Sequence, residues 1–169
     1  PPNPLPDASL AAALKARARE LGADLAGLVD AAPLPQAAAY DRWVAAGMHG
    51  SMGYMASRAA QRREIKLWYP EARSVLLCGF FYASNAHAPP RPGRGRIARY
   101  ARLQDYHPEL KRRLESLVPW LRQRQPGADG RVFVDTSPVL ERLYARTAGL
   151  GWIGKNTMLI APRRGSYFF

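Results

Sequence analysis

The sequence is poor in cysteine, in acidic residues and in long apolar runs. Its single cysteine, Cys78, excludes a disulfide framework and a cysteine metal site, so we expect no protein-ligated metal and a cytoplasmic location. No apolar run is long enough to span a membrane, and residues 1–4 lack the charge and hydrophobicity of a secretory signal. These absences predict a protein without a membrane partner.

The composition favours one folded domain with a basic surface. The chain has 169 residues, of which 47% are hydrophobic, and this suits a single domain at residues 1–169 with an unstructured lead-in at residues 1–6. The net charge of +12 comes mostly from arginine. A basic protein of this size tends to bind polyanions such as RNA, but a composition rich in arginine and alanine also arises from coding bias. Charge alone leaves both explanations open.

The pattern of apolar residues predicts a mixture of helices and strands. A helix is expected at residues 10–21, capped by Asp7 or Ser9 and ended by Gly22. Further helices are expected at residues 36–46 and 106–124, the last bent or split by Pro119. Strands are expected at residues 24–29 and 74–82, and a hairpin is expected to join residues 157–161 to residues 166–169. The segment at residues 74–82 is continuously apolar, which predicts burial on both faces of that strand.

The stretch at residues 131–156 carries the strongest signal. Residues 131–134 are mostly apolar and predict a buried strand that ends at Asp135, where a sheet of this kind meets a ligand pocket. A helix is expected at residues 139–147, started by the hydroxyl and proline side chains at residues 136–138. The glycines that follow indicate positive φ angles or a close backbone approach, and their spacing differs from a dinucleotide fingerprint.

Asp135 is the best candidate for a catalytic group. A carboxylic acid in a dry pocket holds its proton at neutral pH, because desolvation disfavours the charged form. The alternative is that Asp135 only caps the helix that follows. A second cluster consists of Asp105, Tyr106 and His107, for which the alternative is a capping aspartate beside packed rings. The methionine-rich loop at residues 48–55 either fills the core or forms a binding surface.

Three motifs, in this order, resemble the N-terminal domain of the epoxyqueuosine reductases, which are cobalamin-dependent enzymes of queuosine-tRNA maturation. They are residues 49–55 (HGSMGYM), Arg99-Tyr100 with Asp105-Tyr106-His107, and residues 135–142 together with residues 148–156 (AGLGWIGKN). The similarity runs over nearly the whole chain, so it is more specific than any one motif.

The resemblance implies an α/β (α+β) fold in which helices flank a central mixed β-sheet, as in corrinoid-binding domains related to flavin reductases and nitroreductases. It implies reduction of epoxyqueuosine to queuosine in tRNA, with Asp135 as the catalytic acid that protonates the departing oxygen. The expected cofactor is cobalamin, the expected partner is the anticodon region of tRNA, and the expected state is a monomer. His107 is not implied as a cobalt ligand.

The same resemblance implies which residues surround the corrin ring. The residues expected to bind cobalamin are Met52, Tyr54, Arg99, Tyr100, Asp105, Tyr106, His107, Arg142, Gly149, Leu150, Gly151, Trp152, Ile153, Gly154 and Lys155. The backbone amides of the glycine-rich loop are expected to hydrogen-bond the amide side chains of the corrin. Glu141 and Arg142 either pair on the helix surface, which would add little stability, or contact the cofactor region as the resemblance implies, with Arg142 the better candidate.

Family enzymes continue into a ferredoxin-like domain with two 4Fe–4S iron–sulfur clusters. This chain ends at Phe169 and has one cysteine, so it cannot hold such clusters. We therefore expect weak or partial cobalamin binding, and no turnover unless another polypeptide or a chemical reductant supplies electrons. Two alternatives stay open, which are a flavin in the same pocket and an arginine-rich RNA-binding module without catalysis.

Overall fold

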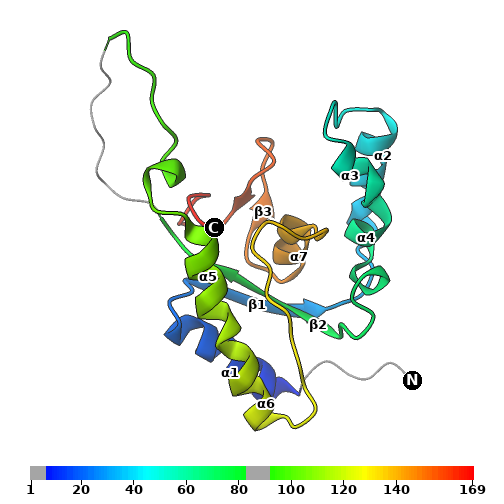
Figure 1. The fold of residues 1–169 in the computed structure, drawn as a ribbon, viewed down its shortest axis with the longest axis vertical. Coiled ribbons are helices and arrows are strands. Elements are labelled where there is room, and N and C mark those ends of the chain that lie inside the picture. The colour runs from blue at the N-terminus through cyan, green and yellow to red at the C-terminus, as the bar shows by residue number, and fades with distance from the viewer. Residues whose placement is uncertain (1–6, 83–91) are drawn as a thin grey trace.

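Helices and small sheets alternate along the chain in this computed structural model, which describes residues 7–82 and 92–169 (Figure 1). The helices are α1 (Ala8–Glu20), α2 (Ala38–Ala45), α3 (Gly53–Ser57), α4 (Ala59–Arg63), α5 (Tyr106–Glu115), α6 (Leu117–Arg124) and α7 (Glu141–Thr147), with 3₁₀ helices at Pro35–Ala37, Ile65–Leu67 and Tyr100–Arg102. The strands are β1 (Leu25–Asp30), β2 (Ser74–Gly79), β3 (Trp152–Ile153) and β4 (Leu159–Ile160). The predicted lead-in at residues 1–6 lies outside the described residues.

The ends of α1 are set by local chemistry. Its N-terminus follows Asp7, whose carboxylate accepts a hydrogen bond of 2.7 Å from the amide of Leu10. Its C-terminus precedes Gly22, which has a φ of +97° that an L side chain rarely adopts. The aspartate cap and the left-handed glycine confirm the helix that the sequence predicts there.

The helix predicted at residues 106–124 is split into α5 and α6. Ser116 separates the two, and its hydroxyl donates to the carbonyl of Arg113 at 2.6 Å. Pro119 causes the break, because proline has no N–H to donate to the carbonyl of Glu115 and its ring would clash with that carbonyl. The sequence therefore predicts both the helix and its interruption.

β1 and β2 form an antiparallel pair in which Leu25 lies opposite Gly79 and Asp30 lies opposite Ser74. The end of the chain extends this sheet: Phe80 and Phe169 exchange two backbone hydrogen bonds of 3.0 Å each. The chain does turn between the two segments of the predicted hairpin, because Ala161 and Gly165 exchange two backbone hydrogen bonds. The predicted strand pairing is wrong, since residues 167–169 pair with residues 80–82 and not with residues 157–161. An apolar run shows that a segment can join a sheet, but it does not specify which strand will be its neighbour.

A second antiparallel pair joins β3 to β4. Within residues 7–82 and 92–169, each of the two named sheets has two strands, and both are antiparallel. The structure confirms the mixture of helices and strands. It differs from the central mixed sheet that the resemblance implies, because no parallel pairing occurs in the described ranges.

The two faces of β2 contact two different hydrophobic clusters. Val75 and Leu77 pack against the cluster around Tyr144, whereas Cys78 packs against the cluster that includes Phe80. This follows from the alternation of side chains along a strand, so both faces are covered, as the apolar sequence predicts. Burial raises the pKa of the Cys78 thiol to about 12, so this cysteine packs as an unreactive apolar group.

The arrangement leaves α7 and β3 between two groups of helices. Figure 1 shows α2, α3 and α4 on one side of the molecule, and α1, α5 and α6 on the other. Across the described part of the chain, the helices are too short or too polar to traverse a lipid bilayer.

Candidate active site

The segment before Asp135 crosses from α6 to α7 without joining a sheet (Figure 1). Val134 packs against the cluster of Phe80, and Val139, beyond the turn, is buried in the cluster of Tyr144. The strand predicted at residues 131–134 is therefore wrong. The apolar side chains anchor the segment to two cores, and none of its described neighbours pairs with it as a strand.

Asp135 sits at the centre of a tight turn between those two anchors. Its φ is +57°, and the amide of Thr136 donates to the carbonyl of Val134 at 2.7 Å. This three-residue turn is uncommon and strained for a residue with a side chain, and such strain gathers at functional sites. The turn leaves the Asp135 side chain 60% exposed, so the predicted dry pocket is wrong for this chain.

The turn brings Asp135 to the first residues of α5. The hydroxyl of Tyr106 donates a hydrogen bond to Asp135 Oδ2, and Nε2 of His107 lies 3.4 Å from the same oxygen. Nδ1 of His107 lies 2.7 Å from Oδ1 of Asp105, which also caps α5 by accepting from the His107 amide at 3.0 Å. The predicted cluster of Asp105, Tyr106 and His107 is therefore present, and Asp105 also caps α5 as the alternative predicted. The cluster forms one network with Asp135.

Packing fixes the ring of Tyr106. Its centroid lies 4.2 Å from that of His107 and 3.7 Å from that of Phe169, and both pairs are stacked. Desolvation and the hydrogen bond to Asp135 raise the pKa of Tyr106, so its hydroxyl stays a donor at neutral pH. The hydrogen bonds from the side chain and the amide of His107 lower the pKa of Asp105, which keeps that carboxylate ionised.

Glu141 has a raised pKa that the sequence reasoning did not anticipate. It is the first residue of α7, and it is exposed at the start of that helix. Desolvation, followed by the nearby charge of Asp135, raises the pKa of Glu141 to about 7. The signal available in the sequence was a carboxylate soon after Asp135, beyond a turn that contains proline. The site therefore has a second proton-binding group that titrates near neutrality.

Arg142 contacts the turn between β3 and β4. Its guanidinium donates to the carbonyl of Thr157, and Nη1 lies 3.4 Å from the hydroxyl oxygen of the same residue. Thr157 has a φ of +65°, so this contact stabilises a turn in a strained conformation. Arg142 thus positions the loop beside the site, and its predicted contact with cobalamin stays a prediction.

The glycines after α7 are explained by the β3–β4 hairpin. A Cβ atom at Gly151 would lie 2.2 Å from the carbonyl oxygen of Ile160, and one at Gly154 would lie 2.7 Å from the Ile160 side chain. The amides of Gly149, Leu150 and Gly154 already donate to carbonyls within the chain. These three donors have partners within the chain, and the predicted contact of the loop with the corrin stays a prediction.

The remaining predicted residues are mostly at the surface. Large apolar side chains are exposed at Met52, Tyr54, Tyr100 and Trp152. The core-filling alternative for residues 48–55 is thus wrong for Met52 and Tyr54. Their role in a binding surface stays a prediction. Three further residues predicted to bind cobalamin are Arg99, Ile153 and Lys155. The guanidinium of Arg99 lies 4.6 Å from the centroid of the Tyr167 ring, Ile153 is half-buried in β3, and Lys155 is exposed.

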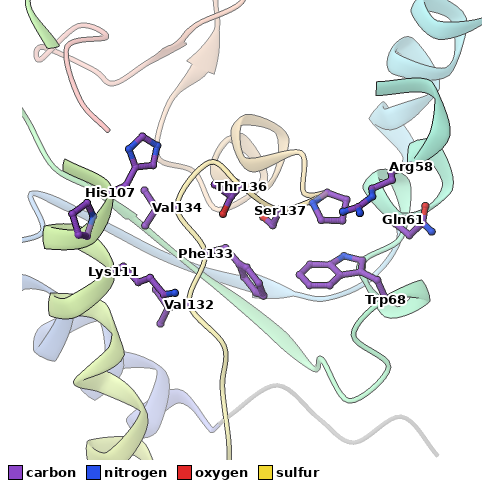
Figure 2. A pocket seen from close by; sticks show the side chains of 12 residues that line it. Arg58, Gln61, Trp68, His107, Lys111, Val132, Phe133, Val134, Thr136 and Ser137 are labelled. Carbon is purple, nitrogen blue, oxygen red and sulfur yellow. The ribbon is translucent and has the colours of Figure 1, made fainter. Parts of the chain in front are cut away.

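A cavity of about 730 Å³ lies beside the Asp135 turn (Figure 2). It is lined by Arg58, Gln61, Trp68, His107, Pro108, Lys111, Val132, Phe133, Val134, Thr136, Ser137 and Pro138. His107 therefore connects the acid network to the cavity, whereas Asp135 itself is not a lining residue. Among the residues that the structure describes, no cluster of three or more histidine, cysteine or acidic side chains is suited to hold a metal ion.

Comparison with known proteins gives consistent matches. A family model described as "Epoxyqueuosine reductase QueG, DUF1730" matches residues 62–136, which include Tyr106, His107 and Asp135. The curated epoxyqueuosine reductase of Gloeobacter violaceus is 42% identical over 164 residues, which is 96% of this chain and 50% of that protein.

Solved structures agree with the sequence matches. An epoxyqueuosine reductase crystallised with an epoxyqueuosine-modified tRNA stem loop superposes with a TM-score of 0.78 at 28% identity, covering 95% of this chain and 44% of that one. An epoxyqueuosine reductase from Bacillus subtilis, with a catalytic aspartate loop swung out of its active site, superposes with a TM-score of 0.76 at 26% identity, covering 95% and 43%.

The fold is that of a reductase family with solved structures. That family is the epoxyqueuosine reductases, which the chain matches in sequence over 96% of its length and in fold over 95%. The chain spans about half the length of the curated relatives it matches.

Proposed function

We propose that this chain is the cofactor- and substrate-binding half of an epoxyqueuosine reductase. The reaction takes up two electrons and two protons, converts the epoxide of epoxyqueuosine in tRNA to the cyclopentene of queuosine, and releases the oxygen as water. The observation that carries the proposal is the Asp135 carboxylate, held on an exposed strained turn by Tyr106 and His107. The relative with a mobile catalytic aspartate loop supports a catalytic role for such a turn.

Asp135 is the proposed proton donor to the departing oxygen. In the chain alone its side chain is largely exposed. A substrate and a cofactor that cover the turn would exclude water, and exclusion of water favours the protonated form of a carboxylic acid. Tyr106 then keeps the carboxyl group in place through its hydroxyl, so the acid is ready only when the site is covered.

The exposed apolar side chains fit a broad apolar ring such as a corrin. Met52, Tyr54, Tyr100 and Trp152 are large apolar side chains that the fold leaves exposed. We propose that they hold cobalamin, with Lys155 as a polar contact at the rim. When bound, cobalamin would supply the low-potential electrons that the reduction needs.

Electrons must reach the cofactor from elsewhere, because one cysteine cannot ligate an iron–sulfur cluster. We propose that the iron–sulfur domain implied by the family belongs to a part of the protein that this chain does not include. The net charge of +12 supports tRNA as the partner, since phosphate contacts by arginine release counterions. The relative solved with an epoxyqueuosine-modified tRNA stem loop supports the same substrate.

The test uses this chain with titanium(III) citrate as the reductant. We expect the absorption spectrum of added cobalamin to change on binding, and we expect an epoxyqueuosine-containing anticodon stem loop to lose one oxygen, measured by mass spectrometry. Flavin mononucleotide is the control ligand. A chain that binds the flavin and not cobalamin would overturn the assignment of the cofactor. A chain that binds the stem loop but never converts it, with cobalamin and reductant present, would overturn the proposed activity.

A further inference from the structure

The cavity beside the Asp135 turn has features that the proposed reaction does not use. Its lining comes from α4, from Trp68, from α5 and from residues 132–138 (Figure 2). Its volume of about 730 Å³ falls in the range of roughly 300–1,000 Å³ that is typical of small-ligand sites. It therefore has room for a ligand of its own, next to the acid network.

Two buried hydrogen-bond donors in the cavity lining lack partners. Ser137 is only 6% exposed, and its hydroxyl has no hydrogen-bond partner among the described residues. The same holds for the buried indole Nε1 of Trp68. A buried polar group without a partner destabilises the folded state, so it is expected to meet a ligand. Both groups donate, so the ligand presents acceptors.

The charge of the lining selects an anion. Arg58 contributes a cation from the start of α4, and Lys111 contributes one from α5 on the opposite side (Figure 2). Lys111 is only loosely paired, since its Nζ lies 3.8 Å from a carboxylate oxygen of Glu115. The lining residues that the structure describes include no carboxylate. The cavity therefore favours a ligand whose negative group contacts either Arg58 or Lys111.

The aromatic residues select a flat ring. Trp68 and Phe133 meet edge to face, with centroids 4.8 Å apart and planes at 71°, and Phe133 keeps part of its ring exposed. Such an arrangement suits a heteroaromatic base, which is flat and carries acceptor atoms. An acceptor-rich flat ring joined to a phosphate is a nucleotide.

We propose that this cavity binds one ribonucleotide unit, with its base against Trp68 and Phe133 and its phosphate near Arg58 or Lys111. A nucleotide of the RNA and the nucleotide tail of cobalamin share this chemistry, and the experiment separates them. The identification of the ligand as an RNA nucleotide or as the cobalamin tail rests on the proposed function. The inference that the cavity binds a nucleotide rests only on the residues that line it. Ser137 supplies the donor that fixes the ligand.

The test compares the chain with Ser137→Ala, and uses Ser9→Ala at the exposed start of α1 as the matched control. Four ligands are titrated: adenosine monophosphate, cobalamin, cobinamide, which lacks the nucleotide tail, and an RNA anticodon stem loop. We expect Ser137→Ala to weaken binding of a nucleotide-bearing ligand by about tenfold. We also expect it not to lower the free energy of unfolding, because it removes an unsatisfied hydroxyl.

The pattern across ligands decides the source. Weaker binding of cobalamin but not cobinamide assigns the cavity to the cofactor tail, and weaker binding of the stem loop assigns it to an RNA nucleotide. Equal weakening for cobalamin and cobinamide, or no change for any ligand relative to Ser9→Ala, would overturn the proposal. A chain that binds adenosine monophosphate through Ser137 but never reduces epoxyqueuosine would contradict the proposed function and leave this inference standing.

Discussion

The hydroxyl of Tyr106 donates a hydrogen bond to the carboxylate of Asp135, and this contact joins the start of α5 to the turn that precedes α7. The Tyr106 ring is itself held between two stacked rings, so the position of the carboxylate is set by packing on another helix. The strained backbone of the turn alone would not fix the acid. The network therefore fixes the position of the Asp135 carboxylate, although Asp135 lies on an exposed turn.

Replacing Tyr106 with phenylalanine tests this positioning. Tyr106→Phe keeps the stacked ring but removes the donor to Asp135, so we expect the single-turnover rate of epoxide reduction to fall about tenfold. Cobalamin affinity should stay the same, because the exposed apolar residues are unchanged. Tyr69→Phe, which removes a hydroxyl away from the network, is the control. A rate equal to that of the control would show that Tyr106 does not position the acid.

Glu141 predicts a pH dependence of stability. Because its pKa is raised from 4.5 to about 7 on folding, the folded protein binds a proton in this interval that the unfolded chain has released. The stability from this group is thus complete below its unfolded pKa and is lost as the pH rises through 7. Glu141→Gln stays uncharged, so the decline in unfolding free energy between about pH 5 and about pH 8 should be smaller than in the parent chain.

Urea unfolding at the two pH values measures this difference. The control is Glu71→Gln, which changes an exposed carboxylate on a turn and should leave the decline as it is in the parent chain. If Glu141→Gln and the parent lose the same stability over this interval, the raised pKa of Glu141 is refuted.

Gly151 tests whether the glycine-rich loop serves the hairpin. Gly151→Ala would place a Cβ atom 2.2 Å from a backbone oxygen of Ile160, so the hairpin must move apart. We expect the free energy of unfolding to fall by about 2 kcal/mol or more, as for other overpacked sites. Gly130→Ala is the control, because its Cβ would lie 3.8 Å from Val118, which is ordinary contact. Equal unfolding free energies for the two variants would contradict this explanation.

Local features could be predicted from the sequence because they depend on neighbouring residues. The cap at Asp7, the stop at Gly22 and the break caused by Pro119 all act within one or two turns of a helix. Strand partners could not be predicted in this way. Residues 131–134 and Phe169 are both in apolar segments, but only the second pairs with a strand. That choice depends on contacts made across the whole chain.

The candidate site was only partly accessible to sequence reasoning. The resemblance grouped Asp135 with Tyr106 and His107, and the structure brings these residues together. The exposure of Asp135 was missed, because an apolar run followed by a carboxylate fits a buried strand end as well as a surface turn. The raised pKa of Glu141 was missed because the desolvation that causes it depends on segments distant in the sequence.

The most direct test of the account is the Asp135→Asn variant in a single-turnover assay with cobalamin, titanium(III) citrate and an epoxyqueuosine-containing stem loop. Asparagine tolerates the left-handed backbone of this turn and keeps the shape of the side chain, but it cannot release a proton. We predict that the variant binds cobalamin as the parent does, while queuosine formation falls by about a hundredfold or more. Queuosine formation at the parental rate would contradict the role of Asp135 as the proton donor.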